Sequence, residues 1–302
     1  MSESPAVSAT PEEPAAGGLL AWENLGARTP GSAFVQTLKE LLFNQRRFFE
    51  KMATTGGLRE PLTFFWILLS AVIAMSFPLA LSHFALTAPD PAEVGSDVYN
   101  LHLLAPRATG FLTVLMPLSL CVGGMITVIQ GTVFHLGARF FGARNWEGSV
   151  SIWCYARSAA LAPIAAAEAL ACAISVLAYL LTVAWPGATA ASASVVHWSL
   201  LILGGAAVLC SLVLFFSAVV NGCLRSFGLT PEVGIAAALA GVLLVVAVAA
   251  FVVLGFYRWG LTGGMITTGG STLMMLALAL THHFAARGVG ARPPRSDPSS
   301  VE

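Results

Sequence analysis

Apolar runs of about twenty residues recur along this chain and constrain its fold more than any other feature. A helix rises about 1.5 Å per residue, so about 20 residues cross a hydrocarbon layer about 30 Å thick. Five such runs are clear, and a sixth contains four glycines, which is typical of either a span or a re-entrant segment; the runs are 62–86, 111–134, 159–185, 198–220, 233–256 and 261–280. We therefore expect an all-α, polytopic transmembrane helical bundle of five to six spans.

The distribution of basic residues predicts the orientation of these spans. Lys and Arg concentrate on the cytoplasmic side of membrane proteins. With the N-terminus in the cytoplasm, six spans place thirteen basic residues inside and two outside, whereas five spans place ten inside and five outside. The count favours a cytoplasmic N-terminus and six spans over five.

Composition and motifs exclude several classes of protein. Only 10% of the residues are charged, and 15 basic residues balance 15 acidic ones, so no basic surface for nucleic acid is expected. The five cysteines are dispersed without a CxxC pair, and the histidines lack ligand partners at helical spacing, so we expect no metal site, cofactor or disulfide framework. No nucleophile elbow or phosphate-binding loop occurs in a strand-to-helix setting, and we expect a protein that is not an enzyme.

The chain divides into five regions by composition. Residues 1–33 are rich in Ala, Pro, Gly, Ser and Glu and predict a disordered tail. Residues 34–60 carry an apolar stripe at helical spacing beside basic residues, which favours an amphipathic helix on the membrane surface; the alternative is a helix packed on the protein's own cytosolic loops. A five-span membrane domain at 61–256, a sixth apolar segment at 257–286 and a disordered C-terminal tail at 287–302 complete the chain.

Two ionisable residues fall in or near the third span. Arg157 and Glu168 are eleven residues apart, close to three helical turns, so they share one face about 16 Å apart and do not touch. A carboxyl group in hydrocarbon needs protonation or a polar partner, and we expect Glu168 to bond a neighbouring helix through Gln130 or a serine. A proton or cation relay is the functional alternative. Small residues at four-residue spacing (Ala165, Ala169 and Ala173; Ala237 and Gly241) predict close helix packing or an oligomer seam.

Three segments, in chain order, resemble the Yip1 domain family of multi-span membrane proteins. They are FNQRRFFEKM at 43–52 followed by GGLREPL at 56–62, FGARNWEG at 141–148 followed by Tyr155 and Pro163, and GLTPE at 228–232. The resemblance covers about residues 40–256. The sequence differs from the family pattern at Gln45, where a proline is usual, and at Ala143, where a second glycine is usual.

The resemblance implies a non-enzymatic membrane scaffold or adaptor that acts in membrane trafficking or organisation through its cytosolic face. The expected partners are the lipid bilayer, a protein on the cytosolic face and a second copy of the chain. The residues expected to contact membrane or partner are Arg46, Arg47, Phe48, Phe49, Trp146, Glu147 and Tyr155. The alternative is a small-solute or ion transporter that uses Glu168 with Arg157 and Gln130. The alanine- and glycine-rich composition favours a bacterial cytoplasmic membrane.

Overall fold

All regular structure in the described residues is helical. The computed structural model describes residues 20–23, 29–55, 57–87, 116–185 and 189–254. Its helices are α1 (Pro30–Phe43), α2 (Gln45–Lys51), α3 (Arg59–Thr87), α6 (Met116–Arg139), α7 (Trp146–Ala184), α8 (Thr189–Ser226) and a last helix, Pro231–Leu254.

Five of these helices, α3, α6, α7, α8 and Pro231–Leu254, are long and apolar enough to cross a membrane. The prediction of an all-α, multi-span architecture is confirmed. The predicted sixth apolar segment and the C-terminal tail lie outside the described residues.

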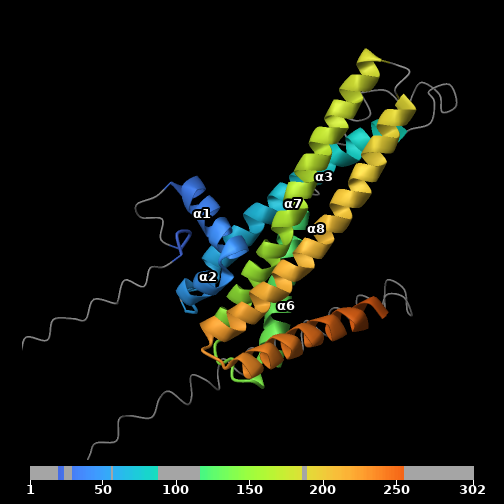
Figure 1. Cartoon of the computed structure of the whole chain (residues 1–302). Coiled ribbons are helices and arrows are strands. Elements are labelled where there is room, and N and C mark those ends of the chain that lie inside the picture. Colours follow the sequence, from blue (N-terminus) through green and yellow to red (C-terminus); the bar gives the residue numbers. More distant parts are fainter. Residues whose placement is uncertain (1–19, 24–28, 56, 88–115, 186–188, 255–302) are drawn as a thin grey trace, which may run out of the picture.

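Helix α7 is the centre of the bundle. It packs against α3, α6 and α8, and α7 and α8 run side by side over most of their length (Figure 1). Short turns join α6 to α7 and α8 to the last helix, so four helix ends gather at one end of the bundle. The start of α3 and the two short helices α1 and α2 lie at the same end, which we name the α1–α2 end (Figure 1).

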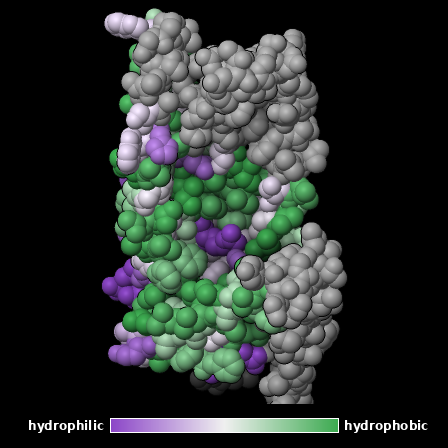
Figure 2. All heavy atoms as spheres, turned by 90° about the vertical axis from the view of Figure 1, so that its right-hand side faces the viewer, coloured by the Kyte–Doolittle hydropathy of each residue, from purple (hydrophilic) through white to green (hydrophobic). Residues whose placement is uncertain are grey.

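The outer surface of the long helices is apolar. Large side chains such as Leu209 and Val213 are 67% and 69% exposed. Figure 2 shows one face of the molecule dominated by hydrophobic residues, with a small hydrophilic patch in its middle. A surface of this extent is unstable in water and stable against lipid chains, which identifies an integral, multi-pass membrane protein.

The buried core is concentrated at the α1–α2 end. Most of the largest fully buried side chains come from α1, α2, α3, α6, α7 and the segment before α1, and they include Leu20, Leu41, Phe48, Phe49, Phe64, Phe65, Phe134 and Tyr155. Farther along the bundle, Ala178 and Val196 form a much smaller cluster with Leu200. Interior packing therefore stabilises one end of the bundle most strongly.

Two predictions for the N-terminal region are corrected. Residues 20–23 and 29–33 are ordered and not part of a disordered tail, since Leu20 is fully buried and Pro30 begins α1; residues 1–19 and 24–28 lie outside the described residues. The predicted single surface helix is two helices, because the chain breaks at Asn44, whose φ and ψ are −144° and 56°. Its apolar stripe packs on the protein itself, against the long helices α3, α7 and α8 and not against cytosolic loops as in the alternative interpretation.

Glycines permit a close crossing between α6 and the last helix. A Cβ atom on Gly137 would lie 2.7 Å from the carbonyl oxygen of Ala240, and one on Gly241 would clash with the ring of Phe134. The predicted small-residue pair Ala237 and Gly241 therefore serves packing within the chain, with Ala237 fully buried. Ala169 and Ala173 are exposed, and the oligomer seam stays a prediction.

Substitution of Gly137 by alanine tests this crossing. Because the added methyl group meets backbone atoms, we expect Gly137→Ala to destabilise the protein by about 1–3 kcal/mol. The matched control is Gly204→Ala on α8, where no atom lies within 4 Å of the added Cβ; it should be neutral or slightly stabilising, since alanine favours helix more than glycine does. Thermal unfolding in detergent measures both, and equal effects would contradict the close crossing.

Candidate functional site

The N-terminus of α7 organises the α1–α2 end. Asn145 is the N-cap, and its side-chain oxygen accepts hydrogen bonds from the backbone N–H groups of Glu147 and Gly148. The amide group of Asn145 donates in turn to the carbonyl oxygen of Thr54, in the loop between α2 and α3. One side chain thus starts the helix and holds a loop that lies about ninety residues earlier in the chain.

The three segments that carry the Yip1 resemblance converge at this point. A carboxylate oxygen of Glu147 accepts a hydrogen bond from the backbone N–H of Gly57 at 3.3 Å. Gly142, in the turn after α6, has a φ of 104°, which favours glycine, and it lies against Leu229 in the turn before the last helix. All three loops therefore belong to one surface.

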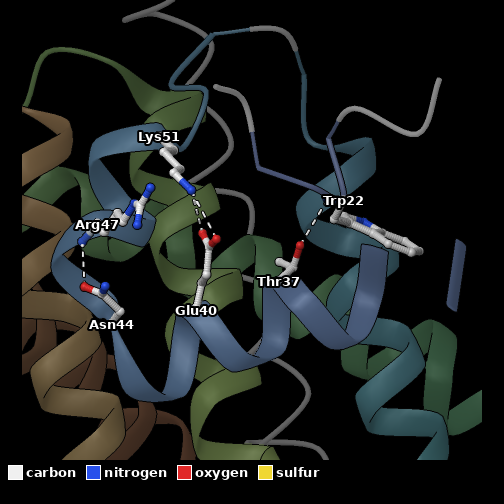
Figure 3. A network of polar contacts seen from close by, with 6 residues as sticks. All are labelled: Trp22, Thr37, Glu40, Asn44, Arg47 and Lys51. Atoms are coloured by element: carbon white, nitrogen blue, oxygen red, sulfur yellow. Dashed lines mark hydrogen bonds and ion pairs between the residues drawn. The ribbon is translucent and has the colours of Figure 1, made fainter. Parts of the chain in front are cut away.

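A short N-terminal segment, Leu20–Glu23, lies across this surface. The backbone N–H of Trp22 donates to the hydroxyl of Thr37 on α1, and its indole N–H donates to the carbonyl oxygen of Glu60 on α3, both at 3.0 Å. Figure 3 shows the first of these bonds beside the ion pair of Glu40 with Lys51, which joins α1 to α2 at 3.0 Å. The segment and the two short helices form one unit.

An aromatic cluster joins this unit to the bundle. The Phe48 ring packs edge-on against the rings of Phe49 and Tyr155, with centroids 5.0 and 4.9 Å away. All three side chains are buried, so the prediction that they contact membrane or a partner directly is wrong. The physical reason is that the protein interior and the membrane are both apolar, so a stripe of apolar residues along a helix can pack against either of them.

Glu23 is held at the edge of this cluster. Its carboxylate oxygens accept hydrogen bonds from the Tyr155 hydroxyl and the backbone N–H of Ala53, both at 3.2 Å. Burial raises the pKa of Glu23 above its usual value of 4.5, and the two hydrogen bonds offset this effect only in part. Docking of the segment therefore makes Glu23 easier to protonate than it is in the free chain.

The remaining predicted contact residues have different surroundings. Arg46 and Arg47 are exposed on α2, and Arg46 pairs with Glu50 at 3.3 Å. The Trp146 indole N–H donates to the Thr132 hydroxyl at 3.1 Å, so this side chain contacts α6. Only the two arginines are fully available at the surface.

An open cleft of about 480 Å³ lies beside these residues. Its lining comes from the α2–α3 loop, the turn before α7 and the turn after α8: Thr54, Gly142, Arg144, Asn145, Ser226, Phe227 and Leu229. Arg144 is exposed and makes no ion pair with any described residue. The cleft therefore presents the guanidinium group of Arg144 beside the hydroxyl groups of Thr54 and Ser226 and the amide group of Asn145.

A buried polar network between α2 and α8 was missed by sequence reasoning. The Gln45 amide donates to the carbonyl oxygen of Leu214, and its oxygen accepts from the hydroxyl of Ser217 at 2.6 Å and the amide of Asn221 at 3.4 Å. A proline at position 45 could not make these bonds. The one feature of the sequence that could have indicated this network is Asn221, a polar residue next to an apolar run.

Inside the bundle, the two predicted ionisable residues are separate as expected. Arg157 donates to Thr127 and to Gln130, both at 2.8 Å. Glu168 accepts a hydrogen bond from Ser76 on α3 at 2.8 Å, so the predicted serine partner is confirmed and Gln130 binds Arg157 instead. Glu168 lines a groove of about 220 Å³ between α7 and α8, whose other lining residues are apolar.

No protein-family model, curated protein or solved structure matches this chain. Within the described residues, no group of three or more His, Cys, Asp or Glu side chains is placed to hold a metal ion.

The docking of Leu20–Glu23 should weaken as the pH rises. Because the pKa of Glu23 is higher in the docked state than in the free chain, the stabilisation is complete below pH 4.5 and is lost as the pH rises through the raised value. Hydrogen exchange of residues 20–23 in detergent at pH 5 and pH 8 measures this change.

Glu23→Gln should flatten this pH dependence, whereas Glu50→Gln, a control at an exposed carboxylate, should leave it unchanged. A wild-type segment equally protected at both pH values would contradict the assignment.

Proposed function

We propose that this protein is a non-enzymatic, Yip1-like membrane adaptor whose α1–α2 end faces the cytoplasm and binds a protein partner, in a bacterial cytoplasmic membrane. The observation that carries the proposal is the convergence of the three family-like segments on one cleft-bearing surface. Segments that only ended helices would not need to hydrogen-bond to one another. Here Thr54, Gly57, Asn145 and Glu147 do so.

The cleft favours a partner with an acidic segment. Arg144 supplies the positive charge, and the adjoining turn carries exposed Arg139 and Phe140, the latter 87% exposed. Arg46 and Arg47 add exposed positive charge on α2. Guanidinium groups bind carboxylates with two parallel hydrogen bonds, which gives both affinity and orientation.

Site-specific photo-crosslinking in native membranes tests this adaptor function. A photoreactive residue at Thr230, exposed beside the cleft, should capture a discrete partner, whereas one at Val35, exposed on α1, should not. Arg144→Glu should reduce the adduct about tenfold through charge repulsion, and Arg144→Lys should keep most of it. Reversing Arg46 and Arg47 together should weaken capture further while leaving membrane insertion intact. An adduct insensitive to the charge at Arg144 would contradict the proposal.

A second candidate function is transport of a proton or small cation through Glu168. It is supported by the position of Glu168 beside a groove between two spans, with one carboxyl oxygen bonded to Ser76 and the other buried without a partner among the described residues. Ionisable side chains within membrane spans commonly mark ion pathways.

Flux measurements in proteoliposomes test transport. Glu168→Gln keeps the acceptor for Ser76 and removes the titrating group, so we expect it to abolish any proton or cation flux. Glu232→Gln, a control at an exposed acid in the first turn of the last helix, should retain the flux. No flux in the wild type, or equal flux in Glu168→Gln, would contradict this function.

A further inference from the structure

Arg157 lies where α3, α6 and α7 meet. Its Nη1 donates to the Thr127 hydroxyl and to the Gln130 side-chain oxygen, and its guanidinium carbon lies 5.2 Å from the centre of the Phe65 ring. The Trp153 indole N–H also donates to the Gln130 oxygen at 3.4 Å. These contacts hold one edge of the guanidinium group in a defined position.

No carboxylate of a described residue forms an ion pair with Arg157. Its partners are a hydroxyl group, an amide oxygen and an aromatic face, all of them neutral. Glu168 shares its face of α7 but is about 16 Å away along the helix axis. A half-buried cation among apolar side chains is costly unless an anion compensates it, so the charge of Arg157 calls for a counter-ion from outside the described chain.

The second edge of the guanidinium group is available. Nε and Nη2 make no hydrogen bond to described residues, and neither is among the buried polar atoms that lack a partner. These two nitrogen atoms form the edge that binds a phosphate or carboxylate with two parallel hydrogen bonds. The contacts of Nη1 thus hold the group in place and leave the Nε–Nη2 edge without a hydrogen-bond partner among the described residues.

The depth of Arg157 favours a lipid ligand. Phe65, which its guanidinium group covers, lies six residues, about 9 Å, from the first residue of α3, whose charged start Arg59 and Glu60 marks the end of the apolar span. An arginine side chain at this depth reaches the headgroup layer. The helices around it present apolar side chains to their surroundings, so an anion arrives here most readily as part of a lipid molecule.

We propose that Arg157, held by Thr127 and Gln130, binds the phosphate group of an anionic phospholipid between α3, α6 and α7. The site is independent of the proposed adaptor function. It gives the bundle a specific lipid requirement at the α1–α2 end.

Native mass spectrometry of the purified full chain in detergent, titrated with phosphatidylglycerol or phosphatidylcholine, tests the proposal. The wild type should retain one phosphatidylglycerol about tenfold more tightly than phosphatidylcholine. Arg157→Gln should remove this preference, and Arg144→Gln, at an exposed arginine of the same end, should keep it. An unchanged preference in Arg157→Gln, or equal loss in Arg144→Gln, would overturn the site.

A second variant keeps the test decisive where Arg157→Gln does not fold. Gln130→Glu places a carboxylate where an oxygen already accepts from Nη1, so it supplies an internal counter-ion without removing the contact. We expect it to fold and to weaken phosphatidylglycerol binding about tenfold, and unchanged binding would overturn the proposal. Inorganic phosphate should not displace the lipid, and any binding of it should not depend on Arg157. If inorganic phosphate displaces the lipid and its binding is lost in Arg157→Gln, the lipid assignment is wrong.

Discussion

The contact between Phe48 and Tyr155 is the interaction on which the α1–α2 end depends. Burying such a side chain contributes about 1.5–3 kcal/mol, and the edge-on ring geometry adds about 0.5–1.5 kcal/mol. It joins α2 to α7 across more than one hundred residues of chain, and so brings the α2–α3 loop to the N-terminus of α7. The cleft around Arg144 exists because that loop is held there. The hydrogen bonds of Asn145 to Thr54 and of Trp22 to Thr37 and Glu60 then fix the loop and the segment Leu20–Glu23 in place.

Polar side chains in the bundle show how the apolar surroundings control structure. Hydrocarbon offers no hydrogen bonds, so each polar group must find a partner on a neighbouring helix or keep an open route to the headgroups. Gln45 follows the first course and joins α2 to α8. Arg157 does both, since one edge of its guanidinium group is bonded to α6 and the other is open. By the same rule, the positions of Glu168 and Arg157 within the apolar bundle need a functional explanation, whereas charged side chains exposed at the ends of the helices do not.

The sequence predicted some features of the site and missed others for identifiable reasons. It predicted the separation of Glu168 from Arg157, because helical geometry converts residue spacing directly into distance. It named a serine as one of two kinds of partner for Glu168, and the structure shows that this serine is Ser76. It assigned Phe48 and Phe49 to a surface, because an apolar stripe does not reveal whether lipid or protein covers it. It missed the ordered segment around Trp22 and Glu23, since four residues are too few to show periodicity, and their partners lie on α1, α3 and α7.

The sequence by itself determined that this protein is a bundle of membrane-spanning helices and where its five described spans lie. The reason is that hydrocarbon thickness demands about 20 apolar residues and forces the backbone to satisfy its own hydrogen bonds. Only the tertiary structure decided which segments meet: the N-terminal segment on Tyr155, the three loops around the cleft, and Gln130 on Arg157. These pairings join residues far apart in the chain, and they depend on how the helices pack rather than on the composition of any single helix.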